Sequence, residues 1–310
     1  MRRARQQGVA VVTAMLLTTL AITIVASLFW QQQVQVRSIE NQRLQLQKQW
    51  ILRGALDWAR LILREDAKFS TVDGLDEPWA VPLSETKLDQ YVENGRADSD
   101  ASDAALSGSI VDAQSLFNLT NVAPNGVVDA AEVLAFSRLL VSQRIDPGLA
   151  QKTADLMKAA APVPPASVAQ PTASSSQLPL TQVDDLLAVA GFTPEFVERL
   201  RPFVVVLPRA TPVNVNTAPA EVLSARVAGL AAGDAAAVVT ARQTASFRDV
   251  ADFNRRLQAS GARAEPSALS VTTNFFLVNG RVRMARAGLD VQALIERNGP
   301  RTNVIWVREH

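Results

Sequence analysis

Acidic side chains between residues 96 and 103 are one place where this sequence could bind a metal ion. The segment reads RADSDASD, and its carboxylates come from Asp98, Asp100 and Asp103. Carboxylates crowded in a loop favour a divalent cation that prefers hard oxygen ligands, such as calcium. Clusters of this kind also occur simply as solvated charge. The sequence therefore offers these three residues as a candidate calcium site, with a solvated loop as the alternative.

A second candidate for calcium begins at Asn121, in the stretch NVAPNGVVDAAE. The stretch has a glycine at its sixth position and a glutamate at its twelfth, as an EF-hand loop has. Its first position is asparagine and its third is alanine, so the cage of oxygens is thin. The candidate ligands are Asn121, Asn125, Asp129 and Glu132. A turn followed by a helix cap explains the same residues without a metal.

The chain lacks most of the side chains on which enzyme catalysis depends. It has no cysteine, and its one histidine is the last residue, His310, which excludes thiol catalysis, cysteine–zinc sites and histidine-dependent triads. Asp184 and Asp185 adjoin, but neighbouring residues of a helix point to different parts of its surface, so they do not form an acid/base pair. A Gly-rich phosphate loop of the G-x-x-x-x-G-K-[ST] type is absent from the sequence. We therefore expect a protein that is not an enzyme.

Residues 223–242, LSARVAGLAAGDAAAVVTAR, are shaped like a helix-hairpin-helix, a unit that often presents the backbone of a Gly-rich turn to DNA phosphates. Such turns usually have glycines two residues apart, whereas Gly229 and Gly233 are four apart and an aspartate follows. Arg226 and Arg242 add positive charge, but the net charge of the chain is only +1. We favour a structural helical domain that does not bind nucleic acid. A membrane-anchored DNA-binding protein of a DNA-uptake or related filament machine is the alternative.

The N-terminal stretch predicts that these elements are held at a membrane. Arg2, Arg3 and Arg5 precede Gly8, and Val9–Trp30 then passes without a charge. An apolar run of this length spans the hydrocarbon core of a bilayer, whereas the apolar core of a cleaved secretory signal is shorter. Because positive charge stays on the cytoplasmic side, we expect a single-pass protein whose N-terminus is cytoplasmic and whose soluble part lies across the membrane.

A continuous helix is expected beyond this apolar run. Leu52, Leu56, Ala59 and Leu63 recur at the spacing of an amphipathic helix. The helix would then extend unbroken to about residue 64 and leave a long spine outside the membrane.

The remaining sequence divides by its local patterns. Residues 67–123 and 267–310 read as short strands and turns, and residues 124–266 read as helices. We therefore expect one sheet interrupted by a helical insertion, whose Pro/Ser-rich stretch 162–180 is a mobile loop. The predicted divisions are 1–8, 9–30, 31–66, 67–123, 124–266 and 267–310.

Short signals predict individual turns and caps. Asn279-Gly280 and Asn298-Gly299 are hairpin signals, because type I′ turns need positive φ at both central residues. Asp129, with Glu132 three residues later, has the spacing of a capping box. Thr217, in VNVNTAPAEVL, is expected to cap the next helix.

Three of these segments together resemble one known family. The basic leader that ends in Gly8 resembles the leaders of type IV pilins and of the pseudopilins of type II secretion. VNVNTAPAEVL resembles the NVNTA signature of the K-type minor pseudopilins, the GspK family, and SGSIVDAQSLFNLTNV at residues 107–122 resembles the opening strand of that family. The resemblance implies that a prepilin peptidase cuts after Gly8 and N-methylates Val9.

The same resemblance implies a fold and a cofactor. The fold would be α+β: a pilin-like long transmembrane and spine helix packed on an antiparallel sheet, with a large inserted all-α domain of the SAM or helix-hairpin-helix kind. Members of the family have also been associated with calcium.

Residue Thr13 carries a further implication of the resemblance. Most pilin-like subunits have a glutamate at this position, and its supposed role is to pair with the α-amine of a neighbouring subunit. A carboxylate buried in a membrane is costly and persists only with such a role. Its absence resembles the K-type branch and implies a place at the tip of a pseudopilus in the periplasm, which the protein would initiate or cap to support protein export across the outer membrane. The implied partners are the I-type and J-type minor pseudopilins, the major pseudopilin, the prepilin peptidase and the inner-membrane secretion platform.

Overall fold

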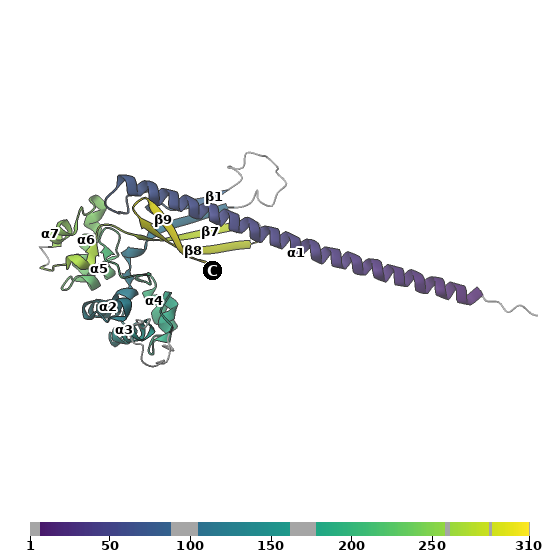
Figure 1. The fold of residues 1–310 in the computed structure, drawn as a ribbon, viewed down its shortest axis with the longest axis horizontal. Coiled ribbons are helices and arrows are strands. Elements are labelled where there is room, and N and C mark those ends of the chain that lie inside the picture. Colours follow the sequence, from purple (N-terminus) through teal and green to yellow (C-terminus); the bar gives the residue numbers. More distant parts are fainter. Residues whose placement is uncertain (1–6, 88–104, 162–177, 258–260, 285–286, 310) are drawn as a thin grey trace, which may run out of the picture. The chain divides into compact units, whose positions relative to one another are not determined.

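The apolar N-terminal run folds as part of a single helix, α1, which extends from Gln7 to Phe69 (Figure 1). The computed structural model describes residues 7–87, 105–161, 178–257, 261–284 and 287–309. Lys68 lies in the last turn of α1, where a cation is stabilised by the negative end of the helix dipole. The long N-terminal helix expected from the sequence is therefore confirmed.

The first part of α1 has the properties of a membrane span. Val9–Ile39 is long and apolar enough to cross a bilayer, and it is the one such helix in the described part of the chain. Thr13, Thr18, Thr19 and Thr23 each donate their hydroxyl to the carbonyl oxygen of the residue four positions earlier, at 2.6–3.0 Å. An unpaired hydroxyl in hydrocarbon is costly, so these internal hydrogen bonds make the threonines compatible with lipid.

Residues 55–310 form a second compact unit, which contains the last turns of α1 and an antiparallel sheet. The five strands lie in the order β1-β2-β7-β8-β9. They are β1 (Leu83–Lys87), β2 (Ala105–Asp112), β7 (Phe275–Met284), β8 (Ala287–Asn298) and β9 (Arg301–Glu309). The strands β2 and β7 are neighbours in the sheet although the whole helical region separates them in the chain.

Alternating side chains give the sheet two buried faces. On one face, Ala59 and Leu63 of α1 pack with Phe276 and Ile295, and Trp79 meets the Phe276 ring edge to face at 5.2 Å. Successive residues of a strand point to opposite faces, so Phe275 lies on the other face, in a cluster with Leu294. Burial of a leucine such as Leu63 contributes about 1.5–3 kcal/mol, and this contact fixes the end of α1 on the sheet.

The two predicted Asn-Gly turns have different outcomes. The prediction at Asn279-Gly280 is wrong: both residues lie inside β7, paired with Gln292 and Val291 of β8, and neither has positive φ. Hydrogen-bonded neighbours on both sides hold this pair in extended conformation. A hairpin does join β8 to β9, but its two turn residues are Gly299 and Pro300: Gly299 has φ 57°, whereas Asn298 is the last residue of β8, pairs with Arg301 and does not have positive φ. The hairpin is therefore confirmed, and the predicted type I′ turn centred on Asn298-Gly299 is wrong.

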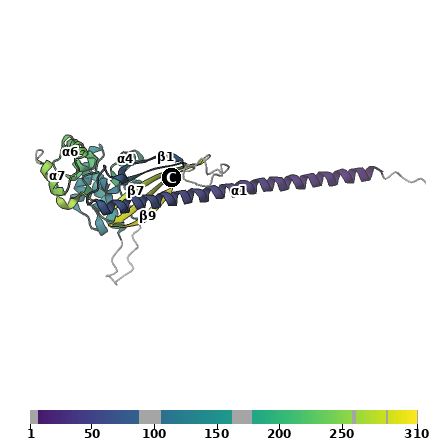
Figure 2. The same cartoon turned by 90° about the horizontal axis from the view of Figure 1, so that it is seen from above.

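The predicted helical insertion is also confirmed. Its helices lie together at one end of the sheet, as the two views in Figures 1 and 2 agree. The α-helices are α2 (Ala130–Ser142), α3 (Gly148–Ala160), α4 (Pro194–Leu200), α5 (Ala220–Arg226), α6 (Ala232–Thr244) and α7 (Val250–Leu257). The 3₁₀ turns are η1 (Pro78–Ala80), η4 (Ala113–Ser115), η5 (Leu119–Val122), η6 (Pro124–Gly126), η7 (Val183–Ala188) and η9 (Pro266–Ala268).

Short parallel strand pairs, which the sequence did not predict, tie this helical region together. The strand β3 (Phe117–Asn118) pairs with β4 (Val204–Val205), and β5 (Val213–Asn214) pairs with β6 (Leu269–Ser270). The helices share one apolar core, in which the rings of Phe117 and Phe136 stack at 5.4 Å.

Asp129 caps α2 as predicted. Its carboxylate accepts hydrogen bonds from the backbone N–H groups of Ala131 (2.9 Å) and Glu132 (3.3 Å). These are two of the N–H groups that a helix start leaves without a partner. Most of the segment predicted as a mobile loop, residues 162–177, lies outside the described residues.

Candidate functional site

A buried carboxylate, Asp112, stands where the sheet meets the helical region. Asp112 ends β2, and its carboxylate accepts four hydrogen bonds. One oxygen accepts from the backbone N–H of Gln114 (2.7 Å) and the hydroxyl of Thr273 (2.5 Å). The other accepts from the amide of Asn214 (2.9 Å) and the hydroxyl of Thr217 (2.6 Å). Because Asn214 and Thr217 belong to the stretch VNVNTA, that motif anchors the helical region to the sheet.

Thr217 therefore has a different role from the predicted one. The helix α5 begins at Ala220, and the preceding residue, Pro219, makes no side-chain cap. The hydroxyl of Thr217 points instead to the buried Asp112, which needs donors because it is out of contact with water. The prediction that Thr217 caps this helix is wrong.

The place where the sheet meets the helical region, around Asp112, is called the junction below. A second buried group, Arg297, joins the end of α1 to this junction. Arg297 lies at the end of β8 and donates to the carboxylates of Asp66 (2.6 Å) and Asp73, and to the carbonyl oxygen of Thr273 (3.1 Å). Its guanidinium also stacks over the Phe276 ring at 4.7 Å. Desolvated charges of this kind are stable only when paired, so Arg297 holds helix, loop and sheet in one arrangement.

The junction holds more negative than positive charge. Burial raises the pKa of Asp112 to about 6 against the effect of its four donors. Burial, and next the charge of Glu77, raise the pKa of Asp66 to about 6, while Arg297 opposes the shift. Burial likewise raises the pKa of Asp73. Here the cost of desolvating each carboxylate exceeds the gain from its partners.

Three of these carboxylates have the proximity that a metal ion requires. Asp66, Asp73 and Glu77 each offer an oxygen, and the three oxygens lie within 4.8 Å of one another. Arg297, however, already supplies counter-charge to two of them, and Glu77 accepts from the indole N–H of Trp79 (2.8 Å) and the backbone N–H of Gly74 (3.0 Å). The cluster is therefore satisfied by the protein's own donors.

The residues predicted for processing and assembly lie at the start of α1. Gly8 and Val9 are in its first turns, and Val9 is exposed. The hydroxyl of Thr13 donates to the carbonyl oxygens of Val9 and Ala10, both at 3.0 Å. Thr13 thus satisfies its polar group within its own helix and needs no partner from another chain.

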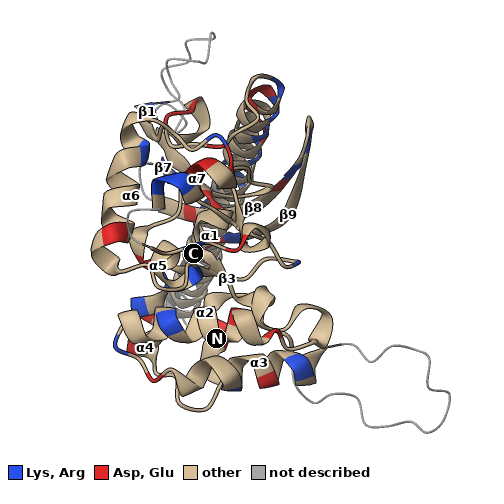
Figure 3. Ribbon diagram, turned by 90° about the vertical axis from the view of Figure 1, so that its left-hand side faces the viewer, with Lys and Arg blue, Asp and Glu red and all other residues tan. Residues whose placement is uncertain are grey.

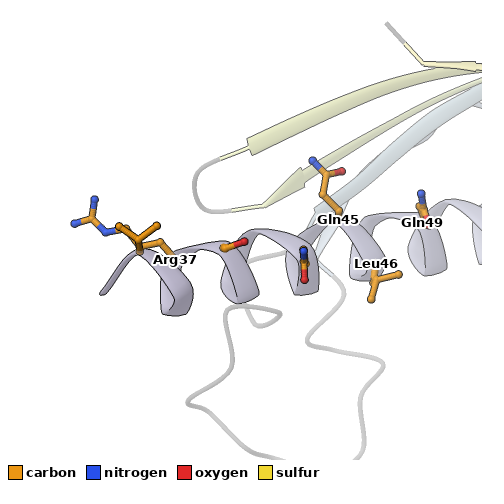
Figure 4. A pocket seen from close by; sticks show the side chains of 7 residues that line it. Arg37, Gln45, Leu46 and Gln49 are labelled. Carbon is orange, nitrogen blue, oxygen red and sulfur yellow. The ribbon is translucent and has the colours of Figure 1, made fainter. Parts of the chain in front are cut away.

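The stretch of α1 that follows the apolar run presents a mixed surface. Gln45 and Gln49, one turn apart, project from the same side of the helix, and Leu46 projects from the opposite side (Figure 4). Leu46 and Trp50 are exposed, at 58% and 68%. Single exposed apolar side chains are common on protein surfaces, so these two residues alone do not define a binding site.

Comparison with known proteins identifies the family. Two family models, both described as "Type II secretion system (T2SS), protein K", match residues 115–209 and 213–272. Together the matched stretches span half of the chain. This chain belongs to the type II secretion system protein K family. The second match begins at Val213, so it contains the VNVNTA motif that binds Asp112.

Individual relatives extend the match over nearly the whole chain. Type II secretion system protein K of Pseudomonas aeruginosa is 29% identical over 303 residues, which cover 92% of this chain and 86% of that protein. The protein K of Klebsiella pneumoniae is 26% identical over 326 residues, with 98% and 96% covered.

A solved structure has the same fold. A chain of the crystal structure of the GspK-GspI-GspJ complex from enterotoxigenic Escherichia coli matches with a TM-score of 0.68 and 19% identity, over 88% of this chain and 99% of that one. The predicted pilin-like α+β fold with its helical insertion is thereby confirmed.

The protein K fold uses several of the predicted calcium ligands for other purposes. The amide of Asn121 is buried and exchanges hydrogen bonds with the backbone of Thr211 (2.8 and 3.0 Å). Glu132 pairs with the buried Arg226. Asn125 has φ 53° in the turn η6 and Asp129 caps α2. Calcium binding by these four residues stays a prediction.

The acidic cluster of the other calcium prediction, Asp98, Asp100 and Asp103, lies outside the described residues. Calcium binding by this member of the protein K family therefore stays a prediction.

The helix-hairpin-helix of the protein K domain does not present its arginines to a ligand. Arg226 pairs with Glu132 and donates to the carbonyl oxygen of Ala268 (2.9 Å), and Arg242 donates to carbonyl oxygens of the VNVNTA stretch. Both side chains are buried, and burial lowers the pKa of Arg242 to about 10. Figure 3 shows basic and acidic residues intermingled on the helices. Binding of DNA phosphates requires exposed positive charge, so the DNA-binding alternative is not favoured.

The junction was missed by sequence reasoning because its members are far apart in the chain. Asp66, Asp112, Asn214 and Arg297 come from four separate segments. The only sequence signal was the motif VNVNTA, which carries three polar side chains, Asn214, Asn216 and Thr217, among apolar residues. Such residues in an apolar context are expected to be buried with partners, although the pattern does not say which partners.

Proposed function

We propose that this protein is a minor pseudopilin of a type II secretion system that assembles with I-type and J-type minor pseudopilins at the tip of the periplasmic pseudopilus. In that position it initiates or caps the filament and supports protein export across the outer membrane. Its further partners would be the major pseudopilin, the prepilin peptidase and the inner-membrane secretion platform. The GspK relative of the solved structure is found in a complex with GspI and GspJ, which supports the choice of partners.

One observation carries this proposal. A single helix contains an apolar, exposed stretch, Val9–Ile39, and ends packed on an antiparallel sheet. The apolar stretch anchors the protein in the inner membrane with a soluble domain outside it. With the N-terminal arginines in the cytoplasm, that domain lies in the periplasm.

The tip position is supported by Thr13 and by the helical insertion. Thr13 binds only carbonyl oxygens of its own helix, so it offers no charge to the α-amine of a subunit above it. The helices α2–α7 and their core add a second body beside the sheet, which is difficult to repeat along a tightly packed shaft. Both features suit a subunit that has neighbours on one side only.

The first experiment is to determine the N-terminal residue and the mass of the membrane-extracted protein. We expect a start at N-methylated Val9 when a prepilin peptidase is co-expressed, and an intact Met1 when it is not. The variant Gly8→Leu should keep residues 1–8 in both cells, because a bulky side chain replaces the glycine at the cleavage point. Loss of the whole apolar stretch, or an intact Met1 with the peptidase present, would contradict the proposal.

A further inference from the structure

Four Asn-Gly sequences occur in this chain, and three of them lie in the part that the structure describes. The three are Asn125-Gly126, Asn279-Gly280 and Asn298-Gly299. In an Asn-Gly sequence the asparagine side chain reacts readily with its own backbone, because glycine has no Cβ to obstruct the approach of its nitrogen. The three positions differ in how firmly the fold holds the reacting groups.

The first two sequences are held by hydrogen bonds. The backbone N–H of Gly126 donates to the carbonyl oxygen of Ala123 (3.1 Å) within the turn η6. Asn279 lies inside β7 with a partner strand on each side, opposite Ser109 of β2 and Gln292 of β8. Its side-chain oxygen also accepts a hydrogen bond from the amide of Gln292 (3.0 Å). A backbone nitrogen or a side chain held in this way reacts only after the structure opens locally.

The third sequence, Asn298-Gly299, is held much less. Asn298 is the exposed last residue of β8 and pairs with Arg301 of β9 on one side only, since the register of β7 with β8 ends at Glu296. Gly299 is exposed and begins the turn that follows, with φ 57°. No hydrogen bond joins the side chain of Asn298 or the backbone N–H of Gly299 to any residue in the described part of the chain. Both reacting groups are therefore open to water at the end of a hairpin, where strands open most readily.

We propose that the fold selects Asn298 for spontaneous deamidation, in which the protein slowly converts this asparagine to aspartate and isoaspartate. The backbone nitrogen of Gly299 attacks the side-chain carbonyl carbon Cγ of Asn298 while its proton passes to water. A C–N bond forms, the side-chain nitrogen takes up a proton and leaves as ammonia, and a five-membered succinimide ring remains. Water then opens the ring at either carbonyl group, which gives aspartate or isoaspartate. The reaction consumes water, releases ammonia and needs no other reactant.

The position of Asn298 gives this reaction a structural consequence. Aspartate adds a negative charge opposite Arg301, which supplies a counter-charge. Isoaspartate instead routes the main chain through the side-chain carbon and so lengthens the backbone between Arg297 and the turn. Because Arg297 holds the carboxylates of Asp66 and Asp73, the longer backbone lies next to the residue that fastens the end of α1 to the sheet.

Peptide mapping by mass spectrometry tests the proposal on the purified full-length protein in detergent, incubated in mildly alkaline buffer. We expect Asn298 to be converted at least about tenfold faster than Asn125 or Asn279, with isoaspartate among its products. The same incubation in urea should bring the three rates within about threefold of one another, since the fold no longer protects any of them. The fourth sequence, Asn94-Gly95, lies outside the described residues and is mapped separately.

Two matched variants give an independent readout, in which an isoaspartyl methyltransferase labels the isoaspartate of the incubated, folded protein. Both carry Asn94→Gln, so that the fourth sequence does not contribute. Asn298→Gln should lower the labelling at least about threefold, because a glutamine side chain closes the corresponding ring far more slowly. Asn279→Gln, the control in β7, should change it less than about 1.5-fold, because the ladder already protects that position.

Three results would overturn the proposal. The first is an equal rate at Asn298 and Asn279 in the folded protein. The second is a preference for Asn298 that persists in urea, because the fold would then not be its cause. The third is aspartate without isoaspartate at position 298, which would show direct hydrolysis and exclude the attack by Gly299.

Discussion

The pH dependence of folding stability should report on the buried carboxylate of Asp112. Its pKa is about 6 in the folded protein against an ordinary value of 3.8. The folded state therefore binds this proton more tightly than the unfolded state does. At about 1.4 kcal/mol per pKa unit, the difference corresponds to about 3 kcal/mol. This contribution to stability is fully present below pH 3.8 and is lost as the pH rises through about 6.

The variant Asp112→Asn isolates this contribution because its amide does not titrate. We expect the free energy of unfolding of wild type to fall by about 3 kcal/mol more than that of Asp112→Asn between about pH 3 and about pH 7. Asp66 and Asp73 titrate in both proteins, so their effects cancel in the difference. The measurement is urea unfolding of the detergent-solubilised full chain at a series of pH values.

The absolute stability of the same variant is a second readout. An asparagine can accept from Gln114 and Thr273 with its oxygen, but its NH₂ group then faces the NH₂ of Asn214, which loses its acceptor. A buried donor without an acceptor costs about 1–3 kcal/mol, which offsets part of the gain from removing a buried charge. The reasoning is refuted if the free energies of unfolding of wild type and of Asp112→Asn change in parallel from acid to neutral pH. Asp112 would then have an ordinary pKa in the folded protein.

Three further predictions concern other parts of the chain. Arg226→Met should lower the free energy of unfolding by about 3–5 kcal/mol, because it leaves the mostly buried carboxylate of Glu132 without its partner. A loss below about 1 kcal/mol in urea unfolding would show that water replaces the pair. Gly126→Ala should cost about 1–3 kcal/mol, since Gly126 has φ 79° and a Cβ there would approach that of Ala161 to 2.4 Å; an unchanged melting temperature would contradict this. Thr13→Glu should impair filament assembly without altering processing, and its repeated incorporation along the shaft, seen by immunogold labelling, would contradict the tip position.

Strong local patterns were sufficient to predict the framework of the fold. The uncharged run Val9–Trp30 and the helical spacing that follows it predicted α1, and the Asp129 cap marked the start of α2 correctly. Each of these depends on residues close together in the chain. The hairpin between β8 and β9 belongs to the same class, although its turn begins at Gly299, one residue later than predicted.

The errors occurred where distant residues override a local preference. Asn279-Gly280 favours a turn by itself, but β2 on one side and β8 on the other hold it in a ladder. Thr217 would cap a helix by itself, but a carboxylate more than one hundred residues earlier in the chain accepts its hydrogen bond. The ion pairs of Arg297 with Asp66 and Asp73 are equally non-local. Neither pattern nor composition reports such partners.

The place at which the helical region leaves the sheet has a consequence for how forces pass through the molecule. The chain departs after Asp112 and returns at Phe275, and Asp112 lies opposite Phe276 in the ladder of β2 and β7. Both ends of the insertion thus attach at one point of two adjacent strands. A force that pulls on α1 reaches β7 and β8 through the contacts of Ala59 and Leu63 with the sheet. These contacts do not involve the helices of the insertion. The helical region can therefore be lengthened between these two ends without a change in strand order, provided that the contacts of Asn214 and Thr217 with Asp112 are kept.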